Sequence, residues 1–245
     1  METDEYLKLA EVEDRMWYFR SLHGHLAREL ARGGVGPGGS VLDAGCGTGG
    51  LIVRWKRERP SWRVSGVDIM PLACRLARER CGSGTDIREG SITALPFGEG
   101  EFDGIVSADV VCQIDRAADA IAEFFRVLRR GGVAAINVPA YMWLWSYHDD
   151  AVHTKHRFTR GEMKALLEAA GFSGVRVTHW NALPFPLVWG KRKLFRTARD
   201  TSDVKLYPAP LELAFNATMA VEHAWLRAGG RWAWGSSVLA VGRKP

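Results

Sequence analysis

With 245 residues, 47% of them hydrophobic and 25% charged, the chain has the composition of a soluble globular protein with one substantial core. Its net charge of +5 allows an anionic partner, but no basic stripe interleaved with aromatic residues points to nucleic acid. No apolar run reaches the roughly 20 residues of a membrane span, and the acidic start does not resemble a signal peptide. Four cysteines without a Cys-x-x-Cys pair favour a reducing compartment, so we expect a cytoplasmic location.

Residues 1–39 are predicted to form a helical cap. Apolar residues recur at near-helical spacing over 6–16 and again over 22–30. An aromatic run at 17–19 lies between these two segments, and such a run most often packs in a core. The glycine-rich stretch 33–39 is expected to lead into the first strand.

The sequence SVLDAGCGTGGLIV at 40–53 predicts a short buried strand, a tight turn and the start of a helix. Gly45 and Gly47 lack a Cβ, so they can adopt positive φ and let a ligand lie against the backbone. The free N–H groups of the opening helix would face that ligand. The spacing of Gly45, Gly47 and Gly50 also fits G-x-G-x-x-G, so a dinucleotide such as NAD is an alternative at this point.

Asp43 favours a different cofactor. A carboxylate two residues ahead of the first glycine would repel a pyrophosphate, whereas it would attract an ammonium and a sulfonium. The stretch VLDAGCGTG resembles the first motif of class I S-adenosylmethionine-dependent methyltransferases, in which an acidic residue precedes the turn that holds the methionine part of the cofactor. The resemblance covers residues 10–180, and it implies that Asp43, Gly45, Cys46 and Gly47 contact S-adenosylmethionine.

The aromatic run ahead of the turn is similar to a pattern of one subgroup of this family. That pattern is E-x-x-x-W-[WY]-F-x-x-R, and here it matches Glu13 and the residues at 17–19. In the subgroup this segment folds over the cofactor. The resemblance therefore implies that Tyr18 contacts the cofactor from the cap.

The second strand is predicted at residues 63–69 and ends in an acid, Asp68, 23 positions after Gly45. A carboxylate there can accept hydrogen bonds from both ribose hydroxyls. Ile69 and Met70 would then pack on one face of the adenine. A helix is expected at 71–81, where proline occupies the first turn.

The third strand, at 85–89, is followed by Ser91 and Ile92, which we expect at the adenine end of the cofactor. The family usually carries an acid near this point, and a serine hydroxyl makes a weaker hydrogen bond than a carboxylate.

The fourth strand is predicted at 104–107, and Ser107 at its end is expected to contact the cofactor, with Asp109 and Gln113 facing the substrate. Many relatives read D-V-x-E-H here, and in some of them the acid and the histidine bind a metal. This chain has Cys112 and Gln113 at those places, so we expect no metal. A helix at 117–130 and a strand at 133–138 complete this part.

Residues 140–159 hold aromatic residues and three histidines in a predicted loop after a strand's carboxyl end, where open α/β sheets bind their ligands. We expect Trp143, Trp145 and Tyr147 to wall an aromatic acceptor. His148 is the candidate general base, because imidazoles titrate near neutral pH, and His153 and Tyr18 are the alternatives. Tyr18 could also orient the acceptor through its hydroxyl.

The same segment is similar to the subgroup pattern H-D-x-x-x-H-x-x-[RH]-R-[YF]-[ST], here at 148–159. An alternative is a structural network in which the histidines cap the next helix. The spacing of His148, His153 and His156 is not the i, i+4 pair usual for zinc.

Thr159 and Glu162 form a predicted capping box at the start of a helix that runs to 171, ahead of a strand at 172–180. The last strand is expected at 236–245. The intervening 181–235 exceed a usual loop and should hold one or two helices, notably at 211–226, that form a lid or a homodimer surface.

This order of elements predicts an α/β fold: a Rossmann-like seven-stranded sheet with helices on both faces, a cap at 1–39, a cofactor-binding core at 40–180 and a helical insertion at 181–235, in one domain of residues 1–245. The resemblance implies S-adenosylmethionine-dependent methyl transfer to the O, N or C atom of a small aromatic or heterocyclic acceptor in specialised metabolism. An NAD-binding oxidoreductase and a non-catalytic cofactor-binding module are the two rival hypotheses.

Overall fold

The computed structural model describes residues 3–194 and 204–245 and contains one seven-stranded sheet in the order β3-β2-β1-β4-β5-β7-β6. All neighbouring strands are parallel except β7, which runs antiparallel to both β5 and β6. The strands are β1 (Ser40–Ala44), β2 (Arg63–Asp68), β3 (Ile87–Glu89), β4 (Phe102–Ala108), β5 (Leu128–Pro139), β6 (Ser173–Trp180) and β7 (Ser237–Arg243).

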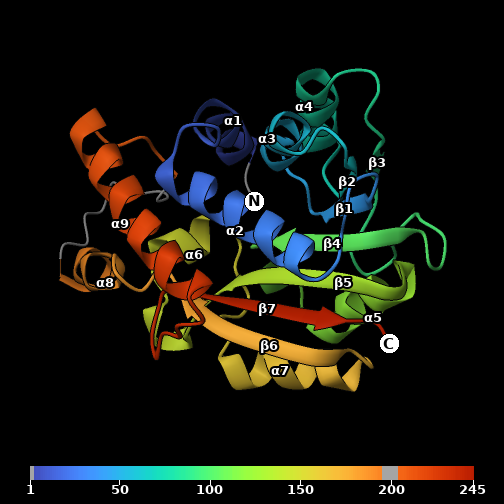
Figure 1. Cartoon of the computed structure of the whole chain (residues 1–245). Coiled ribbons are helices and arrows are strands. Elements are labelled where there is room, and N and C mark those ends of the chain that lie inside the picture. Colours follow the sequence, from blue (N-terminus) through green and yellow to red (C-terminus); the bar gives the residue numbers. More distant parts are fainter. Residues whose placement is uncertain (1–2, 195–203) are drawn as a thin grey trace.

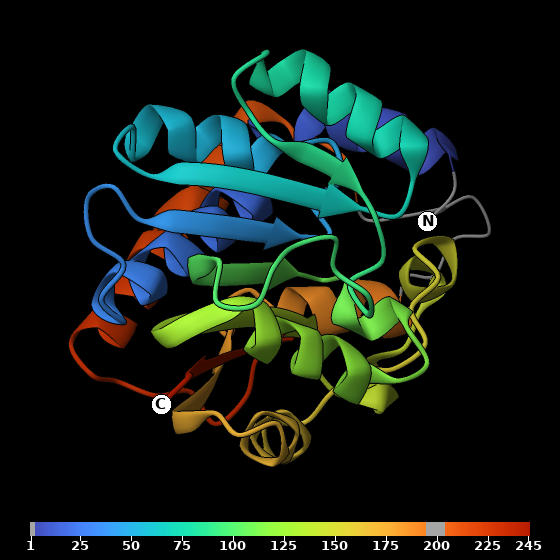
Figure 2. The same cartoon turned by 90° about the vertical axis from the view of Figure 1, so that its right-hand side faces the viewer.

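Helices cover both faces of this sheet, as Figures 1 and 2 show. The helices are α1 (Thr3–Val12), α2 (Trp17–Arg32), α3 (Gly50–Glu58), α4 (Pro71–Cys81), α5 (Ala117–Val127), α6 (Tyr147–Ala151), α7 (Arg160–Ala169), α8 (Phe185–Leu194) and α9 (Ala209–Arg227). Two short 3₁₀ turns are η1 (Val111–Gln113) and η2 (Met142–Leu144). The Rossmann-like α/β fold expected from the sequence is confirmed.

The hydrophobic core has two layers, one on each face of the sheet, because side chains alternate in direction along each strand. Val41 and Val106 pack on the side of α2 and α3, whereas their neighbours Leu42 and Ile105 pack on the side of α5 and α7. Successive side chains of a strand point to opposite faces, so strands that are apolar at both positions are covered on both faces. The carboxyl ends of β1, β2, β4 and β5 therefore meet at one edge.

The insertion between β6 and β7 packs against the cap. The ring of Phe215 in α9 stacks on Trp17 at a centroid distance of 4.8 Å, and the Glu212 carboxylate accepts the Trp17 backbone N–H at 2.9 Å. The predicted helix at 211–226 is thus present as α9, and α8 precedes it. Cap and insertion form one cover on the same end of the sheet (Figure 1).

Two elements differ from their predictions. The helix expected at 117–130 ends at Val127, because Leu128 is extended and already pairs with Phe102 as the start of β5. The predicted loop at 140–159 contains η2 and α6, and α6 begins with a capping box of Ser146 and Asp149. A helix of five residues is too short to show a periodic pattern in sequence.

Candidate active site

A cavity of about 520 Å³ opens at the carboxyl ends of the central strands and is closed on one side by α1 and α2. Its size lies within the range of small-molecule sites. The predicted site residues that line it are Tyr18, Asp43, Gly45, Cys46, Gly47, Asp68, Ile69, Ser91, Ile92, Asp109, Gln113, His148 and His153.

The glycine turn after β1 has the backbone geometry expected of it. Gly45 has φ of 87° and Gly47 has φ of 52°, both in the region that favours glycine. The N–H groups of Gly45 and Cys46 donate to the Val67 carbonyl, which fixes the turn against β2. A Cβ on Gly45 would collide with the side chain of Val110. The absence of that Cβ lets β1 and the segment after β4 approach closely.

Asp68 at the end of β2 is held by the backbone around it. Its carboxylate accepts the Gly47 N–H at 2.9 Å and the Met70 N–H at 3.0 Å. The Tyr6 hydroxyl of α1 also hydrogen-bonds to it, an arrangement that the sequence did not predict. Burial raises the pKa of Asp68 above its usual value, and the two backbone donors oppose that shift.

Asp43 is a buried carboxylate without a counter-charge. It is 2% exposed, and within the described residues it forms no ion pair. Burial, with smaller contributions from Glu13 and Asp68, raises the pKa of Asp43 to about 8. A cationic ligand would supply the missing charge, so Asp43 and the Cβ-free turn fit the ammonium end of S-adenosylmethionine.

Glu13 connects the cap to the glycine turn. Its carboxylate accepts hydrogen bonds from the Thr48 hydroxyl and from Arg80 of α4, and a Cβ on Gly50 would collide with it. Burial raises the pKa of Glu13, while Arg80 and Thr48 oppose the shift. The chain between α1 and α2 is thereby fixed to the glycine turn and to α4.

At the expected adenine end, the structure corrects two predictions. Ile69, which is 66% exposed, lines the cavity, but Met70 does not and contributes a backbone N–H to Asp68. Ser107 does not line it either, because its side chain is fully buried and donates to the Ala44 carbonyl at 2.9 Å. The Ser91 hydroxyl, which does line the cavity, lies 2.8 Å from that of Thr93.

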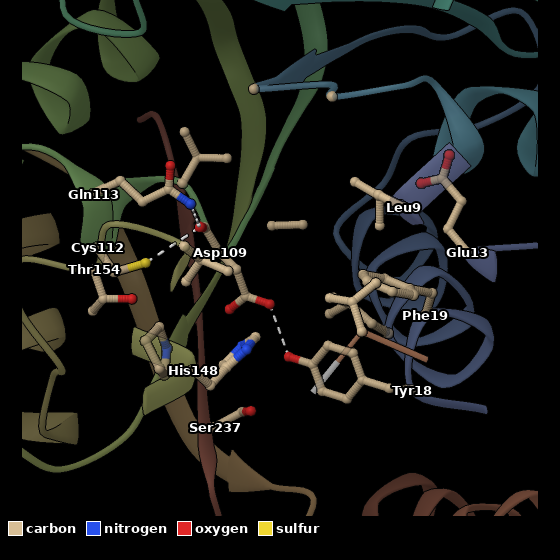
Figure 3. Close-up of a pocket in the computed structure, with 18 of the residues that line it drawn as sticks. Leu9, Glu13, Tyr18, Phe19, Asp109, Cys112, Gln113, His148, Thr154 and Ser237 are labelled. Carbon is tan, nitrogen blue, oxygen red and sulfur yellow. Dashed lines mark hydrogen bonds between the residues drawn. The ribbon is translucent and has the colours of Figure 1, made fainter. Parts of the chain in front are cut away.

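Tyr18 and Asp109 face each other across the cavity, as Figure 3 shows. The Tyr18 hydroxyl donates to Asp109 at 2.8 Å, and the Asn137 side chain donates to the other Asp109 oxygen, also at 2.8 Å. Asn137 in turn accepts the indole N–H of Trp180, whose ring stacks on Tyr18. Burial and the nearby Asp109 raise the pKa of Tyr18 well above its usual value, so this phenol stays protonated and acts as a donor.

The predicted aromatic wall is wrong, because Trp143, Trp145 and Tyr147 do not line the cavity. Tyr141 has φ of 60° and turns the chain so that η2 carries Trp143 outward, where it is 52% exposed and stacks on Tyr141. The Trp145 indole donates to Asp150 at 3.0 Å.

The histidine segment lines the cavity and is held in place by a buried ion pair. His148 and His153 line the cavity. Asp149 and Arg157 form an ion pair of 2.6 Å in which both side chains are almost completely buried. Arg157 also donates to the carbonyls of Ala140 and Tyr141, so this pair holds the segment after β5 in place.

His156, in contrast, is turned away from the cavity. It is half-buried and lies 3.2 Å from Glu162 of the capping box at the start of α7. His156 therefore lies at the start of the next helix, as in the structural network considered above, whereas His148 and His153 lie at the cavity.

Cys112 and Gln113 stand where some relatives carry a metal-binding acid and histidine, and here they hydrogen-bond within their own segment. The Cys112 thiol and the Gln113 side-chain amide both donate to the Asp109 carbonyl, each at 3.2 Å. Across residues 3–194 and 204–245 no group of three or more His, Cys, Asp or Glu side chains is placed to hold a metal ion. That the reaction needs no metal stays a prediction.

Comparison with known proteins identifies one domain within the chain. Residues 42–136 match the model of the methyltransferase domain. Over 117 residues the chain is 37% identical to erythromycin 3''-O-methyltransferase of Saccharopolyspora erythraea, which covers 45% of this chain and 38% of the relative. It is 32% identical over 151 residues to malonyl-[acyl-carrier protein] O-methyltransferase of Enterobacter lignolyticus, covering 59% and 58%. The chain thus spans less than two thirds of these relatives.

The solved structure of geranyl diphosphate C-methyltransferase from Streptomyces coelicolor A3(2) has the same fold, with a TM-score of 0.64, 18% identity and coverage of 92% of this chain and 79% of that one. Residues 42–136 thus form a methyltransferase domain with the fold of the class I S-adenosylmethionine-dependent enzymes. The matched residues contain the glycine turn and the ends of β2 and β4. The cap and the insertion lie outside them.

Several lining residues of this methyltransferase were not predicted from the sequence. Tyr6 and Leu9 reach the cavity from α1, and Ser237 reaches it from the start of β7. Asn137 does not line the cavity but holds Asp109, and it had a usable signal, since a lone amide in the apolar strand Val133–Val138 needs a partner when it is buried. Nothing in the sequence indicates that α1 would bring Tyr6 onto Asp68.

Proposed function

We propose that this chain transfers the methyl group of S-adenosylmethionine to a small aromatic or heterocyclic acceptor. The observation that carries the proposal is one cavity with two chemically different parts. One part offers the Gly45–Gly47 turn and the uncompensated Asp43. The other offers aromatic rings of the cap and the polar group of Tyr18 and Asp109.

The cofactor part fits S-adenosylmethionine better than a dinucleotide. Asp43 would hold the ammonium, Asp68 the ribose hydroxyls, and Ile69 one face of the adenine. When bound, the cofactor supplies a methyl group that its sulfonium makes electrophilic. The pKa of Asp43 is raised to about 8, so a bound cation would stabilise its carboxylate, whereas a pyrophosphate would repel it. For the ribose to reach Asp68, the Tyr6 hydroxyl has to leave it.

The acceptor part favours an apolar, flat molecule with a polar atom. The cavity is lined there by Trp17, Tyr18, Phe19 and Tyr207, in place of the aromatic residues after β5. Tyr18 is fixed by Asp109 and by the stacked Trp180, so its hydroxyl can orient an acceptor without a loss of side-chain entropy. Aromatic walls suit an aromatic or heterocyclic ring and also attract a cationic cofactor.

The proton released from an O or N acceptor needs a base in the cavity. Tyr18 is unsuitable, because its raised pKa keeps the phenol protonated. His148 on α6 lines the cavity on the side of Asp109 and Cys112 (Figure 3), so we propose it as the general base, with His153 next.

The names of the similar proteins leave the acceptor open. They specify erythromycin, a carrier-bound malonyl group and geranyl diphosphate, with transfer to oxygen or carbon. Acceptor class, single-domain organisation over 1–245 and action in the cytoplasm are therefore parts of this proposal. The four cysteines, all free and buried, support a reducing compartment.

The test has two stages. S-adenosylmethionine, and not NAD, should raise the melting temperature of the protein, since a ligand that binds only the native state stabilises it. Labelled methyl groups should then appear on members of a panel of small aromatic and heterocyclic acceptors. Stabilisation by NAD alone would indicate an oxidoreductase. Cofactor binding with no labelled product across acceptors of all classes would indicate a non-catalytic binding module.

A further inference from the structure

The exposed apolar residues of this protein are concentrated in the insertion. In the described part of the chain, twelve large hydrophobic side chains are exposed, and eight of them lie between residues 181 and 235. These are Leu183, Leu187, Trp189, Leu211, Leu213, Val221, Trp225 and Trp234. This concentration of exposed apolar side chains in one segment is the kind of feature that marks an interaction surface.

Helix α9 has two faces, and only one of them is covered. Its inner face packs on α2 through Phe215, the buried Met219 and His223, which lies 2.9 Å from Arg28. The outer face carries Leu213 and Val221, exposed by 71% and 64%, with alanines at 217, 220 and 224 between and beyond them. Residues at these spacings lie on one side of a helix. Figure 1 shows α9 at the outer edge of the molecule.

The charges that accompany this outer face are all basic. Over residues 181–190 and 204–235, for which exposure is described, the exposed charged side chains are Lys205, Arg227 and Arg231. Both acids of that part are used internally: Glu212 accepts the Trp17 and Tyr207 N–H groups, and Glu222 accepts those of Ala182 and Leu183.

The sequence shows the same bias. Residues 181–235 contain eight Lys and Arg against four Asp and Glu, a net charge of +4 out of the +5 of the whole chain. Apolar side chains together with tryptophan and basic residues are the composition of segments that lie on anionic lipid surfaces.

We propose that the outer face of α9, with Trp225, Trp234, Arg227 and Arg231 at its carboxyl-terminal end, binds an anionic membrane surface. The apolar side chains would enter the headgroup region, and the arginines would contact lipid phosphates. No helix in the described residues is long and apolar enough to span a bilayer, so the contact is peripheral.

A second copy of the chain fits this face less well than lipid. A two-fold dimer places the same patch on both copies. Among the residues of the insertion whose exposure the structure describes, no acid is exposed, so Arg227 and Arg231 would find no counter-charge among those residues in such an interface. A lipid surface supplies anions and an apolar layer together. The predicted homodimer is therefore the competing outcome of the test.

The test measures co-sedimentation of the full chain with vesicles, without cofactor or acceptor, so its result does not depend on the proposed methyl transfer. Phosphatidylcholine vesicles that contain phosphatidylglycerol should bind the protein at least about tenfold more tightly than phosphatidylcholine alone, and added salt should weaken binding.

Two double variants identify the surface. Arg227→Glu with Arg231→Glu should weaken binding to anionic vesicles by at least about tenfold, because each removes an attraction and adds a repulsion. The matched control, Arg75→Glu with Arg130→Glu, changes the net charge equally at two exposed positions that form no ion pair with described residues, and it should bind nearly as the parent does. Leu213→Glu with Val221→Glu should also lose vesicle binding.

Three results would overturn the proposal. The first is an equal loss of vesicle binding in the control and in the arginine variant, and the second is no preference for anionic vesicles. The third is a parent protein that does not bind vesicles but forms a dimer in sedimentation velocity, which Leu213→Glu with Val221→Glu converts to a monomer. Circular dichroism melting of each variant establishes that it is folded.

Discussion

Asp43 makes the affinity of the cofactor depend on pH in a direction that the structure fixes. Its pKa is raised to about 8 by burial and by the nearby acids, so at pH 7 most molecules of the free protein carry it protonated. If the ammonium of the cofactor binds beside it, the bound state favours the carboxylate and binding releases a proton. Affinity should therefore increase as the pH rises toward 8.

The size of this effect follows from the ionised fraction. With a pKa of about 8, roughly half of Asp43 is ionised at pH 8 and about one part in a hundred at pH 6, so affinity should rise about fiftyfold, or about 2 kcal/mol, between them. The measurement is isothermal titration with S-adenosylhomocysteine, which keeps the ammonium but cannot react. Titrations in buffers of different ionisation enthalpy should report the release of nearly one proton at pH 7.

The control is Asp43→Asn, which keeps the shape of the side chain but not its charge. This variant should bind weakly and with little pH dependence. Protonation of a group whose pKa is raised on folding stabilises the free protein, so wild-type stability should fall from pH 5 to pH 8. The stability of the variant should fall less, because only Glu13 and Asp68 still contribute in this way. A flat affinity profile in the wild type would refute the reasoning, and an equal slope in the variant would assign the proton to Glu13 or Asp68, whose pKa values are also raised.

Three further predictions concern the same cavity. Asp68→Ala should lower the affinity for S-adenosylhomocysteine by about 1.5 to 3 kcal/mol in titration, the scale of hydrogen bonds to a charged group, and unchanged affinity would remove Asp68 from the ribose site. His148→Ala should reduce turnover about a hundredfold to ten-thousandfold while leaving that affinity nearly intact, because a general base acts only in the chemical step. Full activity would pass the role to His153 or to an acceptor that needs no base. Turnover should persist in excess chelator, and activity that is lost there and restored by magnesium or zinc would contradict a metal-free reaction.

The cofactor part of the site was predictable because local sequence determines it. A buried strand, an acid, and glycines that adopt positive φ are all encoded within residues 40–53, and β2 repeats the strand-end acid at Asp68. Parallel strands bring those ends to one edge whatever the loops do. Their arrangement in the fold is confirmed, while the contacts with a cofactor stay predictions.

The acceptor part was less predictable because it depends on contacts between distant segments. The aromatic residues and their position after a strand's carboxyl end suggested that Trp143, Trp145 and Tyr147 would face the substrate, yet Tyr141, with its positive φ, directs the chain outward. The rings that do line the cavity come from the cap and from Tyr207, which are more than 100 residues apart in the sequence. No periodicity within a segment reports which other segment will cover it.

The cap does more than cover a finished site. Glu13 binds Thr48 and Arg80 at the glycine turn, whereas Tyr18, five residues later, binds Asp109 at the end of β4. Ahead of both residues in the sequence, α1 carries Tyr6, whose hydroxyl hydrogen-bonds to Asp68. A ligand that takes Asp68 from Tyr6 therefore acts on the helix that precedes Glu13, and through Glu13 on the segment that carries Tyr18. If Asp68 holds the ribose and Tyr18 orients the acceptor, as proposed, then the stretch from Tyr6 to Tyr18 connects cofactor binding to the position of the Tyr18 hydroxyl.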